Sequence, residues 1–426
     1  MKNISLFLFL LAFKAQAADD SLLAVVLMVK NEAPAIVETL QPFVKGGVKR
    51  FLVFDTGSTD GTQNIIRDYF KKEGLTHAYV LEEPFINFAT SRNHALTSAE
   101  NLFPETTFMI MPDAEWYIHN VEGLLEFCAQ EKPNSHSCYF LQERSPNVNG
   151  IETMTLAVPR LMRANAHVRF VGPVHEIPDH IPTISVPSTT YVTHQPCAQG
   201  REKTSQRFHR DITLLLKELE KNPTDPRTLF YLAQTYECLN DWENAYIYYK
   251  KRADVGGWNE ENFMTYLRLG DVAQKLFPKE KENLPLLPAV KHCPQTFALQ
   301  SFLQHRNQTL YPIAVGHYLE AYASRPERAE SLIRIARYYL DLNQMPLAFL
   351  FAAQAARIPY PDRDILFVEK EKYTYTRYDT LGIAAWYVQE YELGEWAVRK
   401  ALEALPDAPH LQHNLKLYCD RKNIKQ

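Results

Sequence analysis

The sequence has few glycines and lacks the glycine-rich turns that bind phosphate in two large enzyme classes. Only 15 of its 426 residues are glycine, against 23 tyrosines, 23 phenylalanines and 46% apolar residues. No Gly-x-Gly-x-x-Gly turn follows the first apolar run, which excludes a typical dinucleotide-binding dehydrogenase, and no Gly-Lys-Ser/Thr occurs, which excludes a P-loop enzyme. The composition predicts a folded, helix-rich protein of two or three domains.

The chain also lacks a strong charge of either sign and any paired cysteine motif. Its formal net charge is −4, so there is no electrostatic footprint for nucleic acid, and we expect no nucleic-acid partner. The six cysteines show no Cys-x-x-Cys pair and no zinc spacing. Cys128 and Cys138 either form a disulfide in an oxidising compartment or remain buried free thiols.

Long apolar runs are absent except near the start of the chain. Residues 4–13 form an apolar stretch between Lys2 and the small-residue site Ala15-Gln-Ala17. This stretch is too short to cross a bilayer, which takes about 20 apolar residues. It fits an export signal over residues 1–17, so the protein is expected outside the cytoplasm or in a secretory lumen, without a stable membrane span. The alternative is an uncleaved start on a cytoplasmic protein.

Three apolar runs do stand out, because each ends in acidic residues. Residues 23–29 precede Asn31 and Glu32, residues 51–54 precede Asp55, and residues 108–111 precede Asp113 and Glu115. Buried parallel strands in open α/β sheets place their ligand crevice at their carboxyl ends. The pattern therefore predicts a nucleotide site at one edge of such a sheet.

The second half of the chain changes to helical periodicity and contains a repeat. Apolar residues recur at helical spacing from residue 209 onward. A unit that begins at Pro226 has small and aromatic residues at the positions typical of the 34-residue tetratricopeptide helix-turn-helix repeat, and two later units repeat the spacing. The alternative is an irregular helical bundle. The positions concerned are Ala233, Tyr236, Ala245 and Tyr249; Ala336, Tyr339, Ala348, Ala352 and Ala355; and Ala385, Ala397, Ala401, Ala404 and Pro409.

Two further segments complete an ordered series of motifs. Residues 88–96 read Phe-Ala-Thr-Ser-Arg-Asn-His-Ala-Leu, and residues 158–163 lead to a Val-His-Glu element at 174–176. In this order the motifs resemble a family 2 glycosyltransferase with a GT-A fold, in the SunS-like group that carries C-terminal tetratricopeptide repeats. The resemblance implies an α/β GT-A domain with a mostly parallel, Rossmann-like sheet over residues 22–197. An all-α repeat domain over residues 205–420 would follow it.

The resemblance also implies which residues bind the donor. Asn31 and Glu32 would contact ribose or base, and Asp55 would accept a proton from the nucleobase imide, which favours UDP. Arg92 and Asn93 would lie beside base and phosphates, with Arg92 alternatively a structural partner of Asp55 or Asp113. Asp60 is preferred as the cap of a helix over residues 63–72, with Thr59 as the other candidate.

The Asp113-Ala-Glu115 element stands where the family carries its Asp-x-Asp motif. Paired carboxylates of this kind hold Mn²⁺ or Mg²⁺ against a diphosphate, and here Asp113 and Glu115 would hold both ribose and metal. The sequence departs from the common form, because Glu115 replaces the second aspartate and Trp116 follows where an acidic residue is frequent. The expected cofactor is therefore a divalent cation, although this departure leaves open whether the domain is fully active.

The Val-His-Glu element supplies the remaining candidates. Glu176 is the expected general base of an inverting transfer. His175 would complete the metal shell or contact the diphosphate, or the pair would only stabilise a turn.

These residues together predict an inverting transferase that moves a sugar from a nucleoside-diphosphate sugar to a peptide, protein or glycan. The repeats would bind the acceptor or mediate a homodimer. Two other functions stay open: a repeat scaffold with an inactive transferase domain, and a nucleotide-sugar binder or hydrolase without a macromolecular acceptor.

Overall fold

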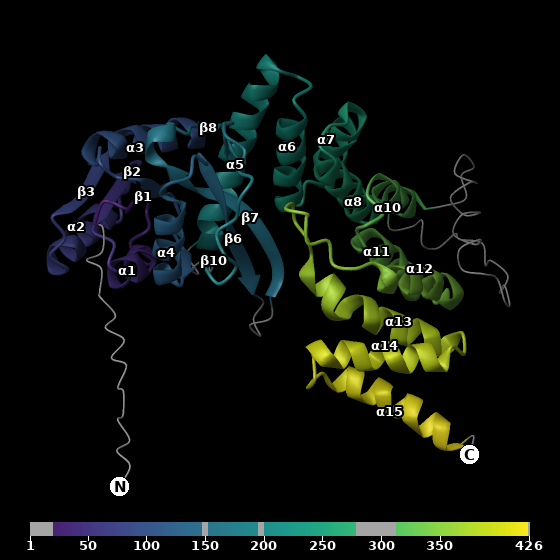
Figure 1. The fold of residues 1–426 in the computed structure, drawn as a ribbon. Helices are drawn as coiled ribbons and strands as arrows, with labels where there is room; N and C mark the ends of the chain where they lie inside the picture. The colour runs from purple at the N-terminus through teal and green to yellow at the C-terminus, as the bar shows by residue number, and fades with distance from the viewer. Residues whose placement is uncertain (1–19, 147–151, 195–199, 278–311, 425–426) are drawn as a thin grey trace, which may run out of the picture.

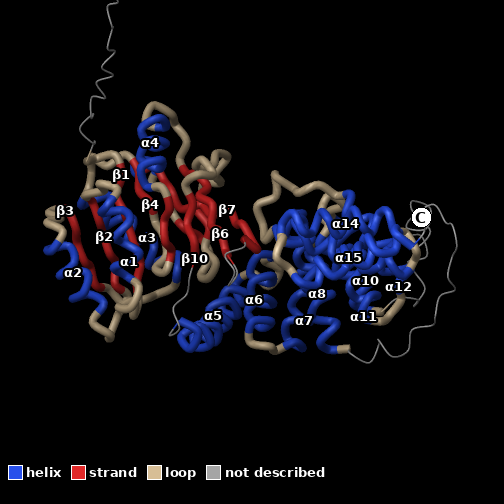
Figure 2. The backbone as a smooth tube through the Cα atoms, turned by 90° about the horizontal axis from the view of Figure 1, so that it is seen from below, coloured by secondary structure: helices blue, strands red, loops and turns tan. Residues whose placement is uncertain are grey.

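The computed structural model describes residues 20–146, 152–194, 200–277 and 312–424, which form a sheet domain followed by a stack of helix pairs (Figure 1). The expected export signal and two of the six cysteines, Cys197 and Cys293, lie outside these residues. Helix α5 (Gly200–Lys221) joins the two parts. In both views the helix pairs lie to one side of the sheet, next to β6 and β7 (Figure 2).

The sheet domain is built on eight strands in the order β3-β2-β1-β4-β7-β6-β10-β5. Strands β1, β2, β3 and β4 run parallel to one another, and antiparallel β7 joins them to β6. The sheet is thus the mostly parallel, GT-A-like one that the sequence predicts. The strand bounds are β1 Leu23–Val29, β2 Arg50–Asp55, β3 His77–Glu82, β4 Phe108–Ile110, β5 Trp116–His119, β6 Cys138–Pro146, β7 Glu152–Arg163 and β10 Tyr191–His194, with a separate pair β8 Phe170–Val171 and β9 Ile177–Pro178.

Helices cover both faces of the sheet, because its central strands are buried on both sides. Side chains of α1 (Ile36–Lys45), α2 (Thr62–Lys72) and α4 (Val121–Glu131) pack with one face, and those of α3 (Phe88–Leu102) pack with the other. Every residue of β2 is buried. Near-continuous apolar runs are the pattern expected of parallel strands with two covered faces.

The helical domain stacks consecutive pairs of helices, as the repeat spacing in the sequence predicts. Helix α6 packs on α7, α8 on α10, α11 on α12 and α13 on α14. Their bounds are α6 Pro226–Cys238, α7 Trp242–Val255, α8 Asn259–Leu276, α10 Ile313–Ser324, α11 Glu330–Asp341, α12 Met345–Arg357, α13 Arg377–Tyr387, α14 Tyr391–Ala404 and α15 Pro409–Ile424, with a π-helical turn at Lys372–Thr376 before α13.

The small residues of the predicted repeat lie where paired helices approach most closely. Ala233 and Ala245 are fully buried between α6 and α7, and the equivalent alanines of the later pairs are buried too. Ala404 is the exception, because it is exposed at the end of α14. Close approach of two helices requires small side chains at the contact, which explains the spacing.

Two details differ from the expectations or decide between them. Helix α2 begins at Thr62, and its cap position is Gly61 at φ 88° rather than Asp60 or Thr59. Asp60 instead accepts hydrogen bonds from the Thr62 amide and hydroxyl. Cys128 and Cys138 are buried free thiols. Within the described ranges, no helix has both the length and the apolar character needed to cross a membrane.

Candidate functional site

The predicted acidic residues gather at one edge of the sheet. Strand β1 pairs in parallel with both β2 and β4, so the loops after these three strands are neighbours. Asp55 ends β2, Asn31 and Glu32 follow β1, and Asp113 follows β4. The carboxyl edge of parallel strands is the usual ligand site of such sheets.

Asp55 is fully buried and presents one unused oxygen. Its Oδ1 accepts hydrogen bonds from the amides of Gly57 (2.9 Å) and Ser58 (2.8 Å) and from Gln63 Nε2 (3.1 Å). Its Oδ2 is buried and accepts no hydrogen bond from the described residues. A buried carboxylate oxygen without a donor is costly, so this position calls for a ligand or water that donates one.

Asn31 and Glu32, in the loop after β1, form hydrogen bonds with the segment that follows β2. Asn31 Oδ1 accepts a hydrogen bond from the Thr59 backbone amide at 2.7 Å, and the Asn31 backbone amide donates to Ser58 Oγ. The Glu32 amide donates to Thr62 Oγ1 at 2.8 Å. These contacts fix the loop that carries Asp55.

Arg92 forms the centre of the site, where it bridges two carboxylates far apart in sequence. Its Nε donates to Glu176 Oε1 at 2.5 Å, and its Nη2 donates to Asp113 Oδ1. Nη2 of Arg160, from β7, lies 3.4 Å from both Asp113 Oδ2 and Glu176 Oε1. Of the two partners considered for Arg92 from the sequence, the structure selects Asp113 and adds Glu176.

The formal charges of this four-residue cluster balance, and the pairing shifts two pKa values. Burial alone would raise the pKa of the Asp113 carboxyl, but the guanidinium groups of Arg92 and Arg160 outweigh it and hold that pKa well below its usual range. Burial would likewise lower the pKa of Arg92, and its two carboxylate partners raise it instead. Asp113 and Arg92 are therefore both ionised at neutral pH.

Two N–H groups in the cluster remain unused. Arg92 Nη1 and Arg160 Nε are buried and donate to no acceptor among the described residues. Both guanidinium groups also lie over the Phe170 ring, 5.7 and 5.3 Å from its centroid. Buried, unsatisfied cationic donors are the groups that bind a phosphate or a nucleobase carbonyl.

Asn93 and His175 are directed elsewhere. The Asn93 side chain bonds to the backbone of Phe170 at both ends, with Nδ2 donating to the carbonyl and Oδ1 accepting from the amide. The His175 ring stacks on Tyr231 of the helical domain. Their predicted contacts with the donor stay predictions.

Three of the predicted site residues adopt a backbone conformation that L-amino acids rarely take. Asn31, Glu115 and His175 have φ values of 57°, 64° and 51°. Residues held at positive φ cluster at functional sites, because surrounding structure must compensate for the strain. Six other described non-glycine residues, outside the site, also have positive φ.

Sequence reasoning missed a buried carboxyl group whose pKa responds to the charge of Asp113. Glu143 of β6 has its Oε1 3.8 Å from His194 Nδ1, on neighbouring β10. Burial, and after it the negative charge of Asp113, raises the pKa of Glu143 to about 7. Burial lowers the pKa of His194 against the opposing effect of Glu115 and Asp113. No motif in the sequence marks Glu143, since only the pairing of β6 with β10 brings it here.

The raised pKa of Glu143 predicts a pH-dependent loss of stability. The folded carboxyl keeps its proton up to a pKa of about 7, against an ordinary value of 4.5. Folding therefore takes up a proton between these values, and stability falls as pH rises through that window, with each pKa unit corresponding to about 1.4 kcal/mol. We expect Glu143→Gln to raise Tm above that of the parent protein at about pH 8 and to leave it unchanged near pH 4.

Tm values of both proteins across this range test the prediction. Glu126→Gln, on the exposed face of α4, is the matched control and should show no pH-dependent difference. A constant offset for Glu143→Gln at all pH values would contradict the assigned titration.

The carboxylates suit a cation shared with a diphosphate better than a site made only of protein ligands. Among the described residues there is no group of three or more histidine, cysteine or acidic side chains that could hold a metal. Mg²⁺ commonly needs only one or two carboxylates when substrate phosphates supply the other ligands. Both oxygens of Asp113 contact guanidinium groups, so a cation held there would share this carboxylate with Arg92 and Arg160.

Comparison with known proteins confirms the resemblance inferred from the motifs. Residues 24–171 match the model of glycosyl transferase family 2. Two curated relatives are the SPbeta prophage-derived glycosyltransferase SunS of Bacillus subtilis (strain 168) and the glycosyltransferase SunS of Bacillus phage SPbeta. Each is 24% identical over 248 residues, which cover 55% of this chain and 54% of the relative. The chain thus spans about half the length of these curated relatives.

Two solved structures are similar to parts of the chain. One is MamA, with 17% identity and a TM-score of 0.31 over 49% of this chain and 94% of that chain. Another is a thermophilic tetratricopeptide-repeat protein of Thermus thermophilus, with 17% identity and a TM-score of 0.29 over 51% of this chain and 94% of that chain.

Proposed function

We propose that this protein, whose N-terminal domain is a family 2 glycosyltransferase domain, transfers a sugar from a UDP-sugar to a hydroxyl or thiol of a peptide, protein or glycan, with inversion. The observation that carries this proposal is the set of unsatisfied buried polar atoms at the sheet edge. Asp55 Oδ2 lacks a donor, and Arg92 Nη1 and Arg160 Nε lack acceptors among the described residues. A uracil imide donates one hydrogen bond, and its carbonyls and the diphosphate accept several.

The reaction then uses Glu176 as the general base. The acceptor oxygen or sulfur attacks the anomeric carbon while the bond from that carbon to the β-phosphate oxygen breaks, and the acceptor proton passes to Glu176. Oε1 of Glu176 is occupied by Arg92 and Arg160, whereas Oε2 accepts no hydrogen bond from the described residues. Oε2 is therefore the proposed proton acceptor.

The leaving diphosphate carries negative charge that the site must stabilise. The unused N–H groups of Arg92 and Arg160 provide part of this stabilisation in a water-poor environment. Glu115, with Asp113, would hold a divalent cation, which when bound acts as a Lewis acid on the diphosphate.

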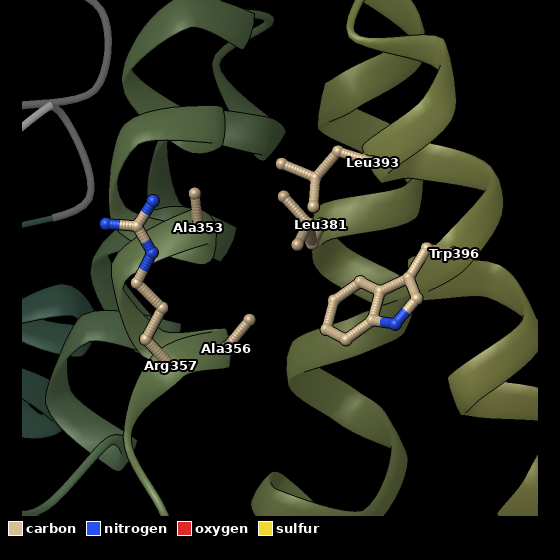
Figure 3. Close-up of a pocket in the computed structure, with 6 residues that line it drawn as sticks. All are labelled: Ala353, Ala356, Arg357, Leu381, Leu393 and Trp396. Atoms are coloured by element: carbon tan, nitrogen blue, oxygen red, sulfur yellow. The ribbon is translucent and has the colours of Figure 1, made fainter. Parts of the chain in front are cut away.

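The helical domain is proposed to bind the acceptor. A pocket of about 210 Å³ opens between α12, α13 and α14. Leu381, Leu393 and Trp396 face Ala353 and Ala356 across it, with Arg357 at its rim (Figure 3). An apolar hollow beside a cationic side chain suits an apolar peptide residue next to a carboxylate.

The proposal predicts that UDP, but neither GDP nor CMP, raises the Tm of the full chain in the presence of Mn²⁺. A ligand at about 100 times its Kd adds roughly 2.7 kcal/mol of stability, which corresponds to several degrees. If none of the three nucleotides shifts the Tm, the donor-site assignment is contradicted and the scaffold function is favoured.

Asp55→Asn is the variant that tests the base contact. The new amide oxygen must replace Oδ1 and accept its three hydrogen bonds, so the NH₂ group takes the place of Oδ2. Two donors then face each other, and we expect UDP affinity to fall roughly 10- to 100-fold, the loss of one hydrogen bond to a charged group. Asp68→Asn, on the exposed side of α2, is the control and should bind UDP normally.

A further inference from the structure

The segment that carries Glu176 joins the two domains. Val174 is buried in the hydrophobic core of the helical domain, and Glu176, two residues later, is buried in the charge cluster of the sheet domain. His175 between them is at φ 51°, which turns the chain sharply. The backbone at Glu176 therefore depends on what holds His175.

Helix α6 holds His175 by both its side chain and its backbone. The His175 ring stacks on Tyr231 with centroids 4.0 Å apart and an interplanar angle of 18°. Arg227 Nη2 donates to the His175 carbonyl oxygen at 2.8 Å, and the Arg227 guanidinium also lies 4.7 Å from the Tyr231 ring centroid. These contacts compensate for the backbone strain of the positive φ of His175.

Helix α3 holds the same segment from the other side. The Phe88 amide donates to the Pro173 carbonyl oxygen at 3.2 Å, and Arg92, one turn further along α3, binds Glu176 itself. Residues 173–176 are thus fixed between a helix of the sheet domain and the first repeat helix. Neither domain alone supplies both sets of contacts.

We propose that Arg227 and Tyr231 are positioning residues for transfer: they hold the 173–176 segment so that Glu176 faces the reacting centre. This inference rests on the proposed role of Glu176. The helical domain thereby becomes a part of the transfer site as well as the proposed acceptor surface. Misplacement of a catalytic group by about 1 Å can cost roughly 100-fold in rate.

Two variants of the full chain test this inference, each with a conservative partner. Arg227→Ala removes the hydrogen bond to the His175 carbonyl, and Tyr231→Leu removes the stacked ring while filling much of its space. Arg227→Lys keeps a donor, and Tyr231→Phe keeps the ring. Tyr248→Leu is the matched control, because it breaks the Tyr236–Tyr248 stack inside the helical domain without contacting the 173–176 segment.

The first readout is hydrogen exchange of the peptide that spans residues 171–178. We expect faster exchange there in Arg227→Ala and Tyr231→Leu, with protection retained in Tyr231→Phe and in Tyr248→Leu. Unchanged exchange in both Arg227→Ala and Tyr231→Leu would overturn the inference, whatever the activity of the protein.

The second readout is UDP release from UDP-glucose, UDP-galactose or UDP-N-acetylglucosamine, together with UDP affinity. For the UDP-sugar that the parent protein turns over, kcat should fall about tenfold or more in Arg227→Ala and Tyr231→Leu, with UDP Kd unchanged. Tyr231→Phe should restore kcat. Equal kcat in all variants that bind UDP would overturn the positioning role. If the parent protein itself does not bind UDP, the proposed function is overturned instead.

Discussion

Replacing Arg92 with methionine is expected to lower the free energy of unfolding by up to about 3–5 kcal/mol, the cost of leaving a buried charge without its partner. The buried charge is Glu176, whereas the side chain of Asp113 is 34% exposed. Arg92 is 4% exposed and contacts both Asp113 and Glu176. Methionine fills similar space but leaves the two carboxylates opposed, with only the Arg160 contacts at 3.4 Å. Urea denaturation of both proteins at neutral pH measures the loss.

Arg67→Met is a control with the same pairing distance in a different environment. Its Nη2 lies 2.5 Å from Glu82 Oε1, as Arg92 Nε does from Glu176, but both side chains are about half exposed. Exposed pairs contribute about 0–1 kcal/mol, so this variant should be nearly as stable as the parent. Equal losses in the two variants would show that the site cluster is not the stabilising unit.

The effect of Arg92→Met should also depend on pH. The folded-state pKa of Asp113 lies below its ordinary value of 3.8, so its pairing contributes stability that is present above that value. This stability is lost as pH falls through the folded-state pKa. The difference between parent and variant should therefore be full at neutral pH and narrow in acid, where the opposed carboxyl groups of the variant take up protons.

Replacing Glu176 with glutamine is expected to lower kcat for transfer by roughly 100- to 10,000-fold, the usual contribution of a general base. The side-chain amide oxygen can still accept the Arg92 Nε hydrogen bond, so the fold and the donor site should persist. UDP affinity should accordingly stay unchanged. The measurement is steady-state turnover of a UDP-sugar beside UDP binding by the same preparation.

Glu143→Gln tests which of two carboxyl groups, Glu143 or Glu176, acts as the general base. Glu143 has a pKa near neutrality, at about 7, whereas Glu176 is paired with two guanidinium groups. If Glu176 is the base, Glu143→Gln should retain most of kcat. If Glu143→Gln instead abolishes turnover and Glu176→Gln does not, Glu143 takes the role of base and Glu176 serves to hold Arg92.

Much of the sheet edge followed from the sequence because local patterns decide it. Strand β1 spans Leu23–Val29 as the apolar run predicts. Strand β2 is one residue longer than its predicted run at each end, and β4 is one residue shorter at its carboxyl end. Acidic residues after such strands had to meet at one edge once the strands ran parallel. Asp55 illustrates this, since its burial and its place both follow from its strand.

The start of α2 shows where local reasoning was wrong. Aspartate is a leading cap residue, so Asp60 or Thr59 was expected to cap the helix. In the structure Gly61 takes the cap position at φ 88°, a conformation that glycine adopts readily, and Asp60 bonds to the Ala33 and Thr62 amides instead. Contact with the neighbouring loop, which the sequence does not display, decides between these arrangements.

The sequence by itself determined the two kinds of domain, the strand ends that carry the acidic residues, and the spacing of small residues between paired helices, because each depends on a period of a few residues. Only the tertiary structure decided what those residues contact. Arg92 meets Glu176 across 84 positions, Asn93 binds the Phe170 backbone, Glu143 lies beside His194, and His175 stacks on Tyr231. Such contacts depend on strand order and domain packing, which bring distant segments together and leave no periodic trace along the chain.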